Sequence, residues 1–259
     1  MKNIITLIIV FFFCCSITAL SQFSENVNYT KRFAEVNAII PDFQVNDDLG
    51  SEGQGFSSIS TDSGGNFVIT WTDGRNDDDI YAQRYSSDGT ALGSNFKVND
   101  DLGSERQWFS SISTDGSGNF VITWGDWRNG DSDIYAQRYS SDGNPLGTNF
   151  KVNDDLGSHW QDKCFVSADE SGSFVIAWSD DYRNGEQDIY AQRYSSDGTA
   201  LGSNFKVNDA SGSVGGWPGP PPPSISTDGS GNFVITWTDG RNDDDIYAQR
   251  YSSDGTALG

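Results

Sequence analysis

The chain has 259 residues, of which 37 are acidic and 16 basic, and its formal net charge is −21. This charge repels the phosphates of nucleic acids and the surface of anionic membranes, so the composition excludes nucleic acid as a partner. Aromatic residues make up 13% of the chain. Acidic disordered segments are poor in aromatic residues, so we expect a folded protein with a substantial core.

The N-terminus has the pattern of a secretory signal peptide. Lys2 precedes an apolar run that ends at Leu20, and small residues precede Gln22, as signal peptidase requires. We therefore expect a signal peptide over 1–21, a leader over 22–42 and a secreted or cell-surface protein. The alternative is an uncleaved membrane anchor, because a run of about 17 residues approaches the length that spans a bilayer.

Cysteine use limits covalent stabilisation. Once the signal peptide is removed, only Cys164 remains, so the mature chain has no internal disulfide. Cys164 precedes Phe165 at the start of an expected strand, and we interpret it as a small buried apolar residue and not as a nucleophile.

Four copies of one unit fill residues 43–259. A Phe-x-Val-Asn motif recurs at spacings of 53, 54 and 55 residues, and residues 65–93 are identical to 231–259 at all 29 positions. A fixed period of this length indicates a repeat architecture. The repeats lie near 43–95, 96–149, 150–204 and 205–259.

Each copy contains four short segments that we expect to be strands, separated by turn-forming residues. Four antiparallel strands in a unit of this length predict one blade of a β-propeller. In the second copy the expected strands are Ser110–Ser113, Asn119–Trp124, Asp133–Tyr139 and Asn149–Asn153.

The fold class predicted is therefore all-β, a β-propeller of four four-stranded blades. Phe43–Asn46 has no strands before it, and the last copy stops before its own Phe-x-Val-Asn motif. We expect the strand 43–46 to close the ring as the outer strand of the last blade, which would remove exposed sheet edges. The alternative is a fragment of a larger propeller.

The repeats resemble a family of bacterial secreted β-propeller repeats found in surface and adhesin-like proteins. The motifs that carry the resemblance are Phe96-Lys-Val-Asn-Asp, Gly118-Asn-Phe-Val-Ile-Thr-Trp, Asp133-Ile-Tyr-Ala-Gln-Arg-Tyr and Ser140-Ser-Asp-Gly, with their counterparts in the other copies. Ser60-Thr-Asp62-Ser-Gly64-Gly-Asn-Phe67 is also loosely similar to the Asp-box of sialidase-type propellers. That resemblance implies a structural turn.

Most of the acidic residues fall in the loops between strands two and three and between consecutive blades, which a propeller places on one face. Crowded carboxylates attract cations, and oxygen-rich clusters suit calcium. No cofactor is required, but we interpret calcium as a candidate ligand of this face; the alternative is that these are solvated turns. The candidate ligands are Asp77, Asp79, Asp131, Asp133, Asp188, Asp243 and Asp245.

The blade-to-blade loops on the same face differ among the copies and carry aromatic residues. Aromatic rings beside carboxylates and amides are typical of carbohydrate sites, where a ring stacks on a sugar face. The alternative is that these rings cap the central channel. The candidate ligand-binding residues are Trp108, Trp127, Trp160, Trp217, Arg128 and His159.

No set of catalytic residues stands apart from the repeats, so the sequence favours a secreted or cell-surface non-catalytic binding or adhesion propeller. Its expected partner is a carbohydrate or a surface protein. The first alternative is a glycoside hydrolase or sialidase-like enzyme, which needs two carboxyl groups in different environments. The second alternative is a set of structural spacer repeats in a larger surface protein.

Overall fold

The structure is a computed structural model that describes residues 42–155, 157, 159–181, 183, 185–209, 222–240 and 244–259. The chain divides into Met1–Gln44 and Val45–Gly259, and the fold described below is that of the second unit. The predicted signal peptide, Trp217 and Asp243 lie outside the described residues. Within those residues, no helix has the length and apolar character needed to cross a membrane.

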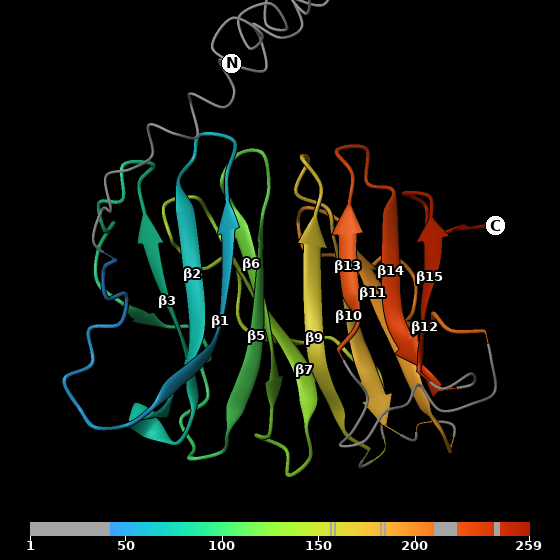
Figure 1. Ribbon diagram of the computed structural model, residues 1–259, viewed down its shortest axis with the longest axis horizontal. Helices are drawn as coiled ribbons and strands as arrows, with labels where there is room; N and C mark the ends of the chain where they lie inside the picture. The colour runs from blue at the N-terminus through green and yellow to red at the C-terminus, as the bar shows by residue number, and fades with distance from the viewer. Residues whose placement is uncertain are drawn as a thin grey trace, which may run out of the picture. The chain divides into compact units, whose positions relative to one another are not determined.

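Four antiparallel sheets of four strands each confirm the all-β, propeller-like fold (Figure 1). Blade 1 also contains a short 3-10 turn, η1 (Gly74–Asn76). The strands of blade 1 are β1 (Gln54–Thr61), β2 (Phe67–Asp73), β3 (Asp79–Tyr85) and β4 (Phe96–Lys97). Those of blade 2 are β5 (Gln107–Thr114), β6 (Phe120–Asp126), β7 (Asp133–Tyr139) and β8 (Phe150–Lys151). Those of blade 3 are β9 (Gln161–Ala168), β10 (Phe174–Asp181), β11 (Gln187–Tyr194) and β12 (Phe205–Lys206). Those of blade 4 are β13 (Ser224–Thr227), β14 (Phe233–Asp239), β15 (Asp245–Tyr251) and β16 (Ala257–Leu258).

Consecutive blades pack face to face, and their first strands, β1, β5, β9 and β13, lie side by side in that order. The packing explains why strands such as β6 are apolar on both faces. Ile122 and Trp124 pack toward blade 1, whereas Val121 on the opposite face packs toward blade 3. A strand between two neighbouring sheets buries the side chains of both its faces, and β6 is buried throughout.

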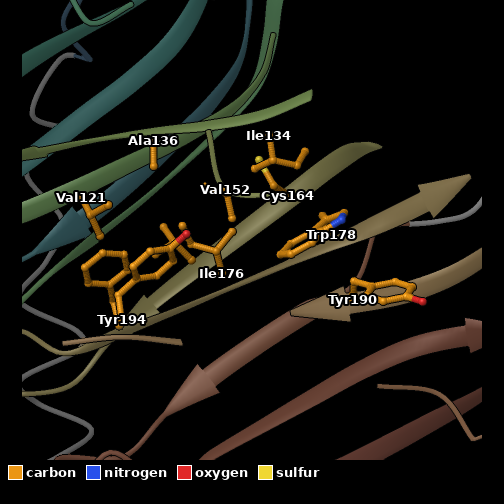
Figure 2. Packing of buried hydrophobic residues seen from close by; sticks show 11 residues of the cluster. Val121, Ile134, Ala136, Val152, Cys164, Ile176, Trp178, Tyr190 and Tyr194 are labelled. Carbon is orange, nitrogen blue, oxygen red and sulfur yellow. The ribbon is translucent and has the colours of Figure 1, made fainter. Parts of the chain in front are cut away.

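The seam between blades 2 and 3 shows the packing in detail (Figure 2). Ile134 and Ala136 of blade 2 face Ile176 and Trp178 of blade 3, and all four are fully buried. Cys164 lies in the same cluster, and its burial raises the pKa of its thiol to about 12. The prediction that Cys164 is a small buried residue is therefore confirmed.

The Asp-containing turns between the first and second strands are structural, as the Asp-box resemblance implied. Asp62 Oδ1 accepts hydrogen bonds from the main-chain N–H groups of Gly64 and Asn66 at 2.8 and 2.9 Å. Asp115 does the same in blade 2, with the same spacing. The first two copies therefore share one turn.

The predicted strand over 43–46 is not formed. Residues 42–49 lie in no strand, and the fourth strand of the last sheet is β16. Residues 45–47 bond to blade 1 instead, where Asn95 donates to the Val45 carbonyl and accepts from the Asp47 N–H at 3.2 and 2.7 Å. Within the described residues, the main contacts between first strands join β1 to β5, β5 to β9 and β9 to β13. The repeated packing at the three seams thus leaves blades 1 and 4 each with an open face.

Candidate functional site

The loops between second and third strands lie against the loops that lead into the blades, as the sequence predicts. The Gln107 N–H donates to the Asp78 carbonyl at 2.7 Å, and the Gln161 N–H donates to the Ser132 carbonyl at 2.8 Å. These bonds place the acidic loops and the variable loops on one face of the array. We call it the loop face.

In blades 1 to 3, the loop between the second and third strands is held by a repeated ion pair. In blade 2, the Arg128 guanidinium bonds to Asp126 and Asp100 at 2.8 Å each and lies 4.2 Å from the centroid of the Tyr135 ring. Arg75 and Arg183 occupy the same setting in blades 1 and 3. Arg128 therefore belongs to the set of main-chain and side-chain contacts that recur from blade to blade, which we call the repeated frame. These contacts engage its cationic group.

The candidate calcium ligands among the described residues do not converge. Asp79, Asp133 and Asp188 are buried and each bonds a lysine from the fourth strand of its own blade, at 2.6–2.7 Å. Asp77 and Asp245 are exposed on separate blades. In the part of the chain that the structure describes, no group of three or more acidic, His or Cys residues is arranged to hold a metal ion. Calcium binding stays an untested prediction.

Three predicted tryptophans come together on the loop face at the seam of blades 2 and 3. The Trp127 ring lies 6.4 Å from Trp108 and 5.3 Å from Trp160, between ring centroids. The cluster continues to Phe109 and then to Phe56 of blade 1, at 5.4 and 4.4 Å. Trp160 is 54% exposed, so the cluster presents an indole face to solvent.

The tryptophans occupy three positions whose main chain repeats while their side chains vary. We call the residue just before the first strand the leading position, and the residue that bonds to it from the end of the second strand, or from the loop just after it, the loop position. In blades 1 to 3 the main-chain N–H of the loop position donates to the carbonyl of the leading position at 2.8–3.0 Å. A glutamine separates the leading position from a flanking position on the first strand, and it is buried in blades 2 and 3 and exposed in blade 1. The leading position holds Gly53, Arg106 and Trp160, the flanking position Gly55, Trp108 and Asp162, and the loop position Gly74, Trp127 and Asp181.

A β-bulge follows the flanking position and sets the direction of its side chain. Phe56, Phe109 and Lys163 are the bulge residues, with φ values of 52°, 54° and 53° in the left-handed region. Side chains other than glycine rarely adopt this conformation, and such bulges are concentrated beside functional sites. The strain thus recurs where the three blades differ most.

Asp162 and Asp181 are the site residues that sequence reasoning missed. They replace Trp108 and Trp127 in the equivalent positions of blade 3, so they have no acidic counterpart in blades 1 and 2. Blade 2 makes room for Asp162 because a Cβ on Gly125 would lie only 3.1 Å from its Oδ1. Aligning the copies on Gln54, Gln107 and Gln161 would have revealed both carboxylates.

Burial raises the pKa of Asp162 to about 6, and the charge of Asp181 contributes to this rise, whereas contacts with Lys163 lower it. Burial also raises the pKa of Asp181. The site therefore combines an indole platform with carboxyl groups that become protonated at a higher pH than an ordinary Asp side chain.

The raised pKa of Asp162 predicts a pH-dependent effect on stability. A carboxyl whose folded pKa exceeds its unfolded value holds its proton more tightly when folded, so its contribution to stability falls as the pH rises from about 4 to about 6. Asp162→Asn should therefore raise the melting temperature relative to wild type above pH 7 and change it less at pH 4. Melting curves at both pH values measure this, and an equal change at both would contradict the prediction.

The remaining predicted ligand residue, His159, is exposed beside Trp160 at the rim of the cluster. Trp124 Nε1 donates to Asp126 at 2.8 Å, whereas the buried Nε1 atoms of Trp108 and Trp127, like that of the strand residue Trp178, have no acceptor among the described residues. A buried indole N–H without an acceptor is therefore not particular to the cluster.

Two cavities near the other ends of the strands belong to the repeated frame. One, of about 290 Å³, lies between blades 2 and 3 and is lined by Arg138, Tyr139 and Phe174. A smaller one, of about 90 Å³, is lined by their neighbours in the next seam, including Arg193 and Tyr194. A cavity that recurs with the packing is less specific than the tryptophan cluster, which occurs once among the described residues.

Comparisons with known proteins support the fold. No family model matches the chain, and no curated protein matches it. A subtype N10 neuraminidase-like protein of A/little yellow-shouldered bat/Guatemala/060/2010 aligns with a TM-score of 0.53 and 14% identity, over 80% of this chain and 57% of that chain. The Hadza microbial sialidase Hz136 gives 0.53 and 13%, over 79% of this chain and 46% of its own.

A third similar structure is the GH93 α-L-arabinofuranosidase of Fusarium graminearum with arabinobiose, with a TM-score of 0.52 and 12% identity over 79% of this chain and 68% of that chain. The chain spans about half the length of the two sialidase-like structures. At these identities the likeness establishes the propeller fold shared with sialidases and arabinofuranosidases.

Proposed function

We propose that the chain is a secreted or cell-surface carbohydrate-binding propeller, and that its sugar stacks on Trp160 at the seam of blades 2 and 3. The observation that carries the proposal is the cluster of Trp108, Trp127 and Trp160. Exposed indole faces stack on the C–H groups of sugar rings, and nearby polar groups bind the hydroxyls. Asp162 and Asp181 supply carboxyl groups beside this platform.

The repeated frame gives this proposal its support. A frame that serves stability alone can carry the same side chains in every blade, as it does for the buried strand residues. The leading, flanking and loop positions instead carry small residues in blade 1 and large or acidic residues in blades 2 and 3. Such one-sided variation on a rigid scaffold is how binding sites are built on repeat proteins.

A glycan array compares the wild type with Trp160→Ala. The wild type should bind a defined set of glycans, and Trp160→Ala should weaken that binding roughly tenfold or more, which corresponds to about 1.4 kcal/mol. Trp160 is half exposed, so the variant should keep its fold. Leu102→Ala, at a fully exposed loop residue, is the matched control and should bind as the wild type does. An array without signal for the wild type would contradict the proposal.

Glycoside hydrolysis is the second candidate function, and the pKa of Asp162 favours it. A carboxyl group with a pKa of about 6 suits a general acid, and solved structures with the same fold include a sialidase and an α-L-arabinofuranosidase. Chromogenic sialosides and α-L-arabinofuranosides test it. Turnover that Asp162→Asn abolishes would support hydrolysis, and no turnover of either would count against it.

A further inference from the structure

The three seams within the chain use one set of residues. One blade contributes its outward face, which in blade 2 contains Val121, Ile134 and Ala136. The next blade contributes its inward face, which in blade 3 contains Val166 and Ile176. Blades 1 and 2, and blades 3 and 4, meet through the equivalent residues. Every inner blade therefore uses both faces.

Blade 4 repeats the third-strand part of this outward face, but none of its described residues corresponds to Val98, Val152 or Val207 of the inner seams. Among the described residues no blade packs on it. Ile246 is 73% exposed, whereas its counterparts Ile80, Ile134 and Ile189 are fully buried. A hollow of about 480 Å³ on this face is lined by residues that include Arg250. The equivalent residues of blades 2 and 3 line the two seam cavities, where the next blade forms the opposite wall.

Blade 1 presents the complementary inward face. Ile59 is 60% exposed, whereas Ile112, at the same position of blade 2, is 5% exposed because it packs on blade 1. Phe67 and Ile69 are half-buried, whereas Phe120 and Ile122 of blade 2 are buried. Large apolar residues exposed together on a sheet face indicate an interaction surface.

Blades 4 and 1 each carry one half of the polar contact that joins neighbouring blades at the inner seams. Arg138 donates to the carbonyls of Asp197 and Ser196 in the turn of the next blade, at 2.5 and 2.6 Å. Arg84 and Arg193 make the equivalent pairs of bonds. Arg250 has no acceptor among the described residues and is exposed.

The equivalent turn of blade 1, which contains Ser87 and Asp88, is the one that receives no arginine among the described residues. The carbonyls of these two residues correspond to those that accept from Arg84, Arg138 and Arg193 at the inner seams. Arg250 is cationic and the turn carries the Asp88 carboxylate, so the two ends are complementary in charge as well as in shape.

We propose that the outward face of blade 4 packs against the inward face of blade 1 of a second copy of this chain. Residues 231–259 are identical to 65–93, so the second and third strands of blade 4 offer the second copy the same side chains that β2 and β3 offer blade 2. Arg250 then donates to the carbonyls of Ser87 and Asp88 of the second copy. This contact is head-to-tail, and two copies that each use both faces complete a ring of eight blades, within the usual range for propellers.

Sedimentation velocity over a wide concentration range tests the assembly. The 259-residue wild type should sediment as a dimer, whereas Ile246→Asp and Ile59→Asp should each be monomeric. An equimolar mixture of the two variants should regain a dimer, because one unmodified pair of faces remains between them. Leu102→Asp, at a fully exposed residue away from both faces, is the matched control and should stay dimeric.

Both substituted isoleucines are exposed, so the variants should fold, and far-UV circular dichroism checks this. A wild type that is monomeric at every concentration would overturn the proposal, and so would a dimer that Ile246→Asp leaves intact. A mixture of the two variants that stays monomeric would exclude the head-to-tail contact. A wild-type mass above two copies would exclude the closed ring.

Discussion

Trp124→Ala should lower the free energy of unfolding by about 3–5 kcal/mol, the usual cost of removing a fully buried tryptophan. The Trp124 side chain is 0% exposed and lies in the seam of blades 1 and 2 with Ile112 and Ile122. Its Nε1 donates to Asp126, which also bonds Arg128. Alanine would therefore leave a cavity in the seam and remove one donor from a buried carboxylate.

Urea unfolding followed by far-UV circular dichroism measures the loss. Trp160→Ala removes a side chain of the same size from an exposed position and is the matched control, with an expected loss below about 1 kcal/mol. Similar losses for the two variants would contradict the assignment of Trp124 to the core and of Trp160 to the surface platform.

The blades could be predicted because each residue class has a local reason for its place. Alternating apolar residues, the Asp and Gly turns and the repeat length are properties of short segments, so the strands of the second copy were predicted within a few residues. The third-strand arginines Arg84, Arg138 and Arg193 recur at one position of the repeat, and each bridges to the next blade.

The site could be predicted only in part, because its chemistry depends on which loops meet. Trp108, Trp127 and Trp160 were recognised as loop aromatics, and the structure brings them together. Asp162 and Asp181 were overlooked because the loops contain many other Asp residues. That these two have no acidic counterparts in blades 1 and 2 becomes visible only when the copies are aligned on their shared main-chain hydrogen bonds.

Contacts between residues that are distant in the sequence explain two further differences between the expected and the observed structure. Asp79 was a candidate calcium ligand, but Lys97, 18 residues later, bonds it across the third and fourth strands. The closing strand over 43–46 was expected from sequence counting. Whether the last blade reaches the first depends on how each seam packs, and that geometry follows from side-chain packing across neighbouring sheets.

The central claim is that three variable positions on a constant frame form a carbohydrate site. A variant with Trp108→Gly, Trp127→Gly and Trp160→Gly removes all three rings of the cluster. Glycine already stands at the leading, flanking and loop positions of blade 1, where the same main-chain hydrogen bond forms at 3.0 Å. The frame should therefore persist, as a cooperative melting transition would show.

The most direct measurement is calorimetric titration of the wild type and this triple variant with the oligosaccharide that binds best on the array. The account predicts that binding weakens at least 100-fold, by about 2.8 kcal/mol, while the variant stays folded. A folded triple variant that binds the oligosaccharide as tightly as the wild type would contradict the claim.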